Sequence, residues 1–164
     1  MSRFPSENVP YLSASAIADL TDVPPDTLRT WRQRGFIDAY GSLGANGWWT
    51  YSLRDAVAVW AGWRLRNEVK LSEGHRPLSV AFAIAPALIA AVRGEGAWRK
   101  YFAAVYTDHT ANGGARGWEI WQGDDLHDIP ADALVVDRLV NVAGFAASVP
   151  PEIRDAILGT DREG

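Results

Sequence analysis

The sequence contains no cysteine, which excludes disulfides, thiolate catalysis and zinc sites that need thiolate ligands. Its N-terminal segment lacks the apolar core of a secretory signal peptide, so we expect a cytoplasmic protein. The most apolar stretch, residues 80–92, is about half as long as the ~20 residues that span a bilayer, and Pro86 interrupts it. We therefore expect a buried helix there and no membrane partner.

An overall excess of basic residues is also missing, because the formal net charge is −4. Residues 1–70 hold eight basic and seven acidic side chains, whereas residues 71–164 hold eight basic and thirteen acidic ones. Residues 27–37 carry three arginines and no acid. Such local clustering matters more for contact with phosphate than the net charge does, so the composition does not exclude nucleic acid.

Helical signals begin after residues 1–10, which we expect to form a flexible arm. Apolar residues recur at helical spacing over residues 14–20, and Ser13 or Ser15 can cap this helix. Residues 21–23 predict a tight turn, because Asp22 tolerates a left-handed conformation. A second helix is predicted over residues 25–34, since proline favours the first turn of a helix and Gly35 suits its end.

Two β-prone runs, residues 36–40 and 48–51, flank a loop with three glycines and predict a β-hairpin. Ser52 and Asp55 then form a capping box, which opens a third helix expected to reach residue 70. These elements together predict a winged helix-turn-helix over residues 11–70, with three helices and a β-hairpin as the wing.

The second half of the chain predicts a separate, small α+β unit over residues 79–164, after a linker at residues 71–78. Its first element is an apolar helix at residues 79–93. About three antiparallel strands and a short final helix follow, at residues 101–107, 116–122, 134–142 and 152–158. The fold class expected for the whole chain is therefore α+β.

A helix fits the major groove of B-DNA, which gives the arginine-rich helix at residues 25–34 a possible role. We expect Thr27, Thr30 and Arg32 to contact base edges, because arginine pairs with guanine and threonine bonds or touches thymine. Arg29 and Arg34 are better placed for phosphate contacts. The full set expected to contact double-stranded DNA is Ser15, Thr27, Arg29, Thr30, Arg32, Gln33, Arg34, Asn46, Tyr51 and Arg54.

Two segments, residues 16–23 and 27–32, resemble the N-terminal pattern of the MerR family, and residues 33–37 resemble the Arg-x-Gly-apolar-apolar piece that follows. The resemblance covers residues 11–70 and implies a DNA-binding module. Three departures stand out: Trp49 replaces the family's wing arginine, Pro24 its serine cap and Asp22 its turn glycine. The family's long coiled coil and metal-binding cysteines are absent, so the resemblance implies nothing about an inducer.

The function expected from these features is that of a sequence-specific transcriptional regulator, and a homodimer would double its reading surface. The alternative is a protein–protein adaptor, in which the acidic second half binds a phage or host factor, a toxin or a polymerase. A third possibility is that the three arginines only form a solvated face.

Sites for chemistry are weak in this sequence. Residues 123–128 resemble an oxygen-rich metal loop without EF-hand spacing, and Asp108 with His109 lacks a nucleophile nearby. We therefore expect no enzyme, no metal and no cofactor. Four aromatic residues of the second half are candidates for an apolar ligand pocket, with core or dimer packing as the competing interpretation: Trp98, Tyr106, Trp118 and Trp121.

Overall fold

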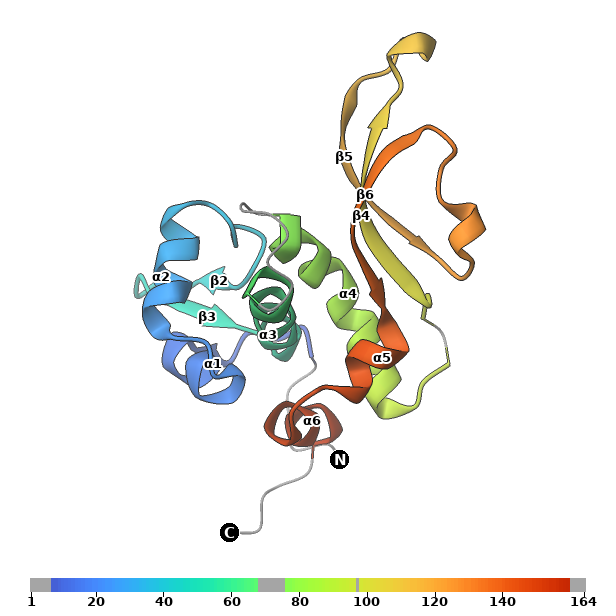
Figure 1. The fold of residues 1–164 in the computed structure, drawn as a ribbon. Coiled ribbons are helices and arrows are strands. Elements are labelled where there is room, and N and C mark those ends of the chain that lie inside the picture. Colours follow the sequence, from blue (N-terminus) through green and yellow to red (C-terminus); the bar gives the residue numbers. More distant parts are fainter. Residues whose placement is uncertain (1–6, 68–75, 97, 160–164) are drawn as a thin grey trace.

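The computed structural model describes residues 7–67, 76–96 and 98–159. Within these ranges the chain forms an α+β fold with six α-helices and two antiparallel three-stranded sheets. Figure 1 shows helix α4 lying between a compact helical part and the second sheet, which extends away from the helices. The expected fold class is thus confirmed at the level of α+β.

The first part of the fold follows the predicted helices closely. It contains α1 (Ala14–Thr21), α2 (Pro25–Gln33) and α3 (Leu53–Asn67). The Ser13 hydroxyl caps α1 by accepting a bond of 3.1 Å from the amide of Ala16. Asp22 ends α1 with a φ of 59° and its amide donates to the carbonyl of Ala18, as expected for a left-handed cap.

The predicted capping box at the start of α3 is also present. The Ser52 hydroxyl accepts a bond of 3.1 Å from the Asp55 amide, and the Asp55 carboxylate accepts one of 2.9 Å from the Ser52 amide. Both side chains are buried, so these reciprocal bonds satisfy groups that water does not reach. The predicted extension of this helix to residue 70 lies outside the described residues beyond Asn67.

The first sheet differs from the predicted hairpin. Its strands are β1 (Leu12–Ser13), β2 (Ser42–Leu43) and β3 (Trp49–Tyr51), in the order β1-β3-β2. The prediction of a strand at residues 36–40 is wrong, because this segment forms consecutive turns. Ile37 and Tyr40 are both buried. Their spacing of three positions suits a turn that buries one side, whereas a strand would need alternation.

The N-terminal segment is tied to this part of the fold from Glu7 onward, which corrects the predicted flexible arm for its last residues. The Glu7 carbonyl accepts a bond of 3.0 Å from the Arg54 amide, and its carboxylate lies 2.6 Å from an Arg93 nitrogen. Tyr11 donates its amide to the carbonyl of Tyr51 at 2.9 Å. Residues 1–6 of the predicted arm lie outside the described residues.

Helix α4 (Arg76–Arg93) begins inside the predicted linker, so residues 76–78 are helical and residues 71–75 are not described. Packing explains why α4 starts earlier than predicted. Leu78 is fully buried against Gly62, and a Cβ added at Gly62 would lie only 2.4 Å from the Cδ2 atom of Leu78. By length and composition alone α4 could cross a membrane. Half of that apolar window is buried inside the fold, where α4 is the central core helix.

The second sheet confirms the three predicted strands. They are β4 (Tyr101–Asp108), β5 (Arg116–Gly123) and β6 (Ala133–Asn141), with β4 in the centre. Two 3₁₀ turns lie between them, η1 (Thr110–Asn112) and η2 (Leu126–Asp128). A bulge interrupts β6 near Arg138, whose φ is 59°.

Two helices close the described chain. The predicted strand at residues 134–142 ends one residue early, because Asn141 caps a helix, α5 (Val142–Ala147), that the sequence analysis missed. The predicted final helix is present as α6 (Pro151–Leu158). Both pack against α4, so one hydrophobic core runs from α1 to α6 through this helix.

Candidate nucleic-acid interface

Helix α2 presents a buried apolar face and an exposed polar face. Leu28 and Trp31 are buried in the core with Ile17 and Val23 of the preceding segment. The polar positions expected to contact DNA, which are exposed apart from the half-buried Thr27, lie on the remaining faces: Thr27, Arg29, Thr30, Gln33 and Arg34. The helix is therefore fixed by its apolar side and leaves a row of hydrogen-bonding side chains toward the outside.

A groove of about 730 Å³ separates α2 from the β2–β3 hairpin. Six of the ten residues expected to contact DNA line it: Ser15, Arg29, Arg32, Gln33, Asn46 and Tyr51. The others do not line this groove, since Thr27, Thr30 and Arg34 lie elsewhere on α2 and Arg54 stacks on Phe82, 4.6 Å from its ring centre. The fold thus brings α1, α2 and the hairpin to one concave surface.

Arg32 has a structural role that the sequence analysis did not foresee. Its guanidinium donates bonds of 2.6 Å to the carbonyl of Ile37 and 2.7 Å to the carbonyl of Tyr40. It also contacts the Tyr51 hydroxyl at 3.3 Å and stacks 3.7 Å above the Trp49 ring. Nη1 and Nη2 are thus engaged within the fold and Nε is buried without a hydrogen-bond partner among the described residues, so these contacts favour a structural role of Arg32 over the predicted contact with a base edge.

Tyr51 and Trp49 are therefore the residues of β3 through which Arg32 contacts the hairpin. Tyr51 is buried, so its predicted contact with DNA would need the hydroxyl that Arg32 already engages. Trp49 receives the cation of Arg32 on its ring. An arginine on α2 and a tryptophan on the strand thus fix the hairpin against the helix.

Tyr40 ties the loop at residues 36–40, whose carbonyls accept bonds from Arg32, to helix α4. Its hydroxyl donates to the carbonyl of Leu78 on α4, and its ring lies 5.0 Å from that of Phe82. Burial raises the pKa of the Tyr40 hydroxyl well above its ordinary value, so it stays protonated and can donate this bond. Loop 36–40 is consequently held by both Arg32 and α4.

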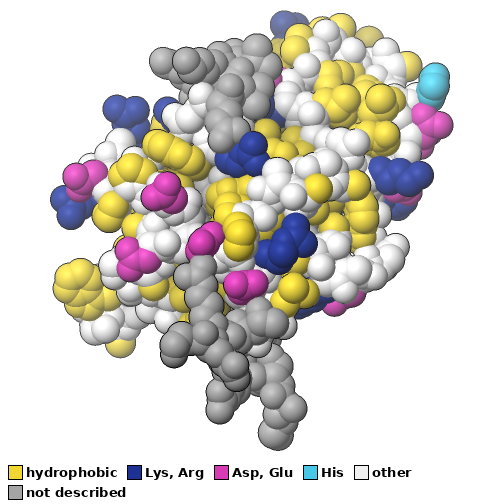
Figure 2. Space-filling view, turned by 60° about the horizontal axis from the view of Figure 1, so that its bottom comes forward, with side chains coloured by type: hydrophobic (Ala, Val, Ile, Leu, Met, Phe, Trp, Pro, Cys, Tyr) yellow, Lys and Arg dark blue, Asp and Glu magenta, His cyan; other side chains and the backbone are white. Residues whose placement is uncertain are grey.

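Charge on the groove is modest. Arg29 is the cation with the largest exposure here, 73% of its side chain, and its pairing with Asp26 at 3.7 Å is a weak surface ion pair. Arg29 and Arg32 are the charged residues that line the groove. The face at the bottom of Figure 1 carries side chains of both signs interspersed among apolar ones (Figure 2). Binding of a polyanion would therefore depend on a few arginines together with neutral contacts.

Trp48 is the residue of this surface that the sequence analysis missed. It lines the groove at the end of the hairpin turn and is 73% exposed, although tryptophan is usually well buried. The available signal was a pair of tryptophans after a glycine-rich loop with no charged residue.

The four aromatic residues proposed for a ligand pocket do not gather at one site, and only Tyr106 and Trp118 are in contact with each other. Trp98 lines a cavity of about 300 Å³ beside α4, whereas Trp118 lines a different cavity of about 220 Å³ and contacts Tyr106. Trp121 faces the opposite side of β5, since side chains alternate along a strand, and donates to the carbonyl of Asp128. Their arrangement supports packing within and around the second sheet.

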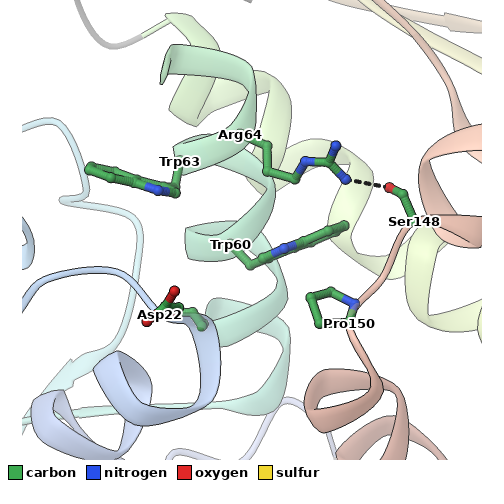
Figure 3. A pocket seen from close by; sticks show the side chains of 7 residues that line it. Asp22, Trp60, Trp63, Arg64, Ser148 and Pro150 are labelled. Carbon is green, nitrogen blue, oxygen red and sulfur yellow. Dashed lines mark hydrogen bonds between the residues drawn. The ribbon is translucent and has the colours of Figure 1, made fainter. Parts of the chain in front are cut away.

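A further pocket of about 290 Å³ lies between the end of α1, α3 and the segment before α6. Figure 3 shows Trp60 and Trp63 along α3, with Arg64 reaching Ser148 and Asp22 at the α1–α2 turn. The Arg64 guanidinium donates a bond of 2.6 Å to the Ser148 hydroxyl. This contact ties the C-terminal helices to α3.

Two of the three carboxylates in the acidic loop that resembles a metal site, those of Asp124 and Asp125, are engaged by other groups of the protein. The Arg99 guanidinium, 2.6 Å away, holds the pKa of the Asp124 carboxyl below its ordinary value. Asp125 caps η2 by accepting from the His127 amide. Among residues 7–67, 76–96 and 98–159, no group of three or more His, Asp or Glu side chains is arranged to hold a metal ion.

Comparisons with protein-family models, curated protein sequences and solved structures found no match to this chain. Its function is therefore inferred from its own residues and their arrangement.

Proposed function

We propose that this chain is a cytoplasmic regulator of transcription that binds double-stranded DNA in a sequence-specific way. Its DNA-binding part would be a MerR-like winged helix-turn-helix. In this proposal α2 enters the major groove and the β2–β3 hairpin serves as the wing on the adjacent backbone. The observation that carries the proposal is the shared groove, in which Arg29 and Gln33 of α2 lie beside the hairpin.

The roles that we propose for the residues of this surface differ in part from those expected from the sequence. Thr27, Thr30 and Gln33 are the candidates for base contacts, because their hydrogen-bonding groups lie along the outer side of α2. Arg29 and Arg34 are the candidates for phosphate contacts, since both are exposed. In this proposal Arg32 supports binding indirectly, because it stacks on Trp49 and contacts the Tyr51 hydroxyl of the hairpin.

Duplex binding by the full chain tests this proposal. The probe is a duplex recovered from a random-sequence pool by repeated binding to the wild type. We expect Arg29→Ala and Arg34→Ala each to weaken binding and to lower the salt slope by about 0.9 for each lost phosphate contact. Arg116→Ala removes a similarly exposed arginine from β5 and is the matched control, with an unchanged slope expected.

Recovery of no duplex above the background of the pool at low salt would contradict the proposal. It would favour the adaptor alternative, in which the chain binds another protein. If all three variants bind with the slope of the wild type, duplex binding uses another surface than α2.

A homodimer is part of the proposal, because two copies would let two α2 helices contact half-sites one helical turn apart. The surface that supports it is the edge strand β6. Four of its apolar side chains are exposed by 42–66%: Leu134, Val135, Val136 and Leu139. Exposed apolar side chains in such number on one strand are typical of a protein contact. Sedimentation over a range of concentrations measures whether the chain self-associates.

A further inference from the structure

Two large apolar side chains stand exposed at the tip of the β2–β3 hairpin. Trp48 is 73% exposed and Leu43 is 60% exposed, on either side of the turn at residues 44–47. The tip is nevertheless well ordered by hydrogen bonds. The Gly44 amide donates to the Trp48 carbonyl at 2.8 Å, and the Asn46 side chain accepts from the Trp48 amide at 3.1 Å. A rigid tip that keeps a tryptophan in water is typical of a contact surface.

The hairpin has no means of holding phosphate by charge. No charged residue occurs from Tyr40 to Ser52. Backbone amides, neutral polar side chains such as Asn46 and the apolar tip are therefore the groups that it offers to a nucleic acid. The two adjacent tryptophans differ in use, because Trp49 packs under the Arg32 guanidinium whereas Trp48 projects outward from a base that Arg32 has fixed.

The position of Trp48 links it to the proposed DNA surface. Trp48 and Asn46 line the same groove as Arg29 and Gln33 of α2. A duplex whose major groove receives α2 would therefore present its neighbouring backbone and minor groove to the hairpin tip. Apolar side chains that enter a minor groove unstack a base step and bend the duplex.

We propose that Trp48, with Leu43 beside it, is an apolar wedge that enters a base step of the bound duplex, unstacks it and bends the DNA. This inference rests on the proposed function and names how its wing would contact the duplex. Binding at the wing would then depend on stacking and deformability of the step, and specificity would arise from steps that unstack easily, such as pyrimidine–purine steps.

The test uses the full chain and the duplex recovered from the random-sequence pool, with dyes at its two ends. Anisotropy gives the affinity and energy transfer between the dyes gives the bend. We expect Trp48→Ala to weaken binding about tenfold, as for loss of one stacked base, and to reduce the bend. Trp48→Phe should retain most of both, because it keeps an aromatic wedge. The salt slope should stay at the wild-type value in both variants, since no charge is removed.

Leu158→Ala is the matched control, because Leu158 is 49% exposed on α6 and outside the groove. A 2-aminopurine base placed at successive steps locates the wedge, since its fluorescence rises where a step is unstacked by the wild type and not by Trp48→Ala.

The possible failures are distinguishable. If the wild type recovers no duplex, the proposed function fails and the inference with it. If the wild type binds and Trp48→Ala binds equally well with the same bend, the inference alone is wrong. If Trp48→Ala loses affinity only for the separated single strands, Trp48 is a platform for single-stranded DNA and the duplex wedge is overturned.

Discussion

The two sheets of this protein each have three strands, but different interactions stabilise them. In the first sheet the strands are two or three residues long, and in the second they are eight or nine. The short sheet cannot be held by its ladder alone, so the Arg32 guanidinium of α2 also fixes β3 through its contacts with Trp49 and the Tyr51 hydroxyl. The long sheet has a full ladder around β4 and packs directly on α4. Side-chain chemistry therefore shapes the first region, and backbone pairing the second.

The two regions also present different surfaces. The first presents polar side chains on α2 and an uncharged hairpin, which suit a grooved, anionic partner. The second presents apolar side chains on an edge strand, which suit a protein partner or a second copy of the chain. The proposed function assigns one binding event to each region, so variants can separate them.

The largest expected effect comes from the helix that the two regions share. Ile84 is fully buried on α4, which packs against α3 on one side and β4 on another. We expect Ile84→Ala to lower the free energy of unfolding by about 2–5 kcal/mol, because it leaves a cavity in the core. Urea denaturation followed by tryptophan fluorescence and by circular dichroism should give one transition, shifted alike for both signals.

Two separate transitions, of which only one moves, would show that the regions unfold independently and would contradict the idea of one shared core. Leu158→Ala, at an exposed position, should leave the midpoint unchanged.

An intermediate effect is expected at the hairpin support. Arg32→Ala removes two charge-assisted bonds to carbonyls and a stacking contact, and we expect a loss of about 2–3 kcal/mol of stability. Arg32→Lys should restore little, because an ammonium cannot reproduce the planar fork. Arg29→Ala is the matched comparison on the same helix, with an expected loss of less than about 0.5 kcal/mol. Thermal unfolding measures all three variants. If Arg32→Ala is as stable as the wild type, the structural role of Arg32 is contradicted, and Arg32 is again a candidate for contact with a base.

The smallest effect on stability is expected at the edge strand. Leu134 is 66% exposed, so Leu134→Ser should change the free energy of unfolding of the monomer by less than about 0.5 kcal/mol. The same variant should weaken self-association about tenfold, if this side chain is buried between two copies. Sedimentation equilibrium measures the dissociation constant. A dimer as stable as that of the wild type would place the subunit contact away from β6.

Much of the fold could be predicted where local chemistry decides it. The caps at Ser13 and Ser52 and the left-handed turn at Asp22 depend on residues a few positions apart. The Ser52 cap and the Asp22 turn were predicted, and Ser13 was one of two serines predicted to cap the first helix. The strands of the second sheet were predicted because β-branched and aromatic runs are separated by turn residues. Helix α5 was missed, since its apolar sequence continues that of β6 and only the Asn141 cap marks the boundary.

The candidate site was harder to predict than the elements that carry it. The sequence placed a cluster of arginines on α2 and predicted base contact for Arg32 and phosphate contact for Arg29, but it could not show which guanidinium the fold itself engages. Arg29 and Arg32 have the same chemistry and differ in whether carbonyls lie within reach. The four aromatic residues of the second half likewise belong to different cavities and faces, because strand register assigns them there.

The sequence by itself determined the helices other than α5, the capping box of α3, the three long strands and the absence of charge on the hairpin, since each depends on residue type and short spacing. Only the tertiary structure decided that Arg32 supports the hairpin, that α4 joins both regions in one core, and that Trp48 projects while Trp49 packs. These outcomes depend on which groups far apart in the chain come within bonding distance, and packing of the whole chain sets that distance.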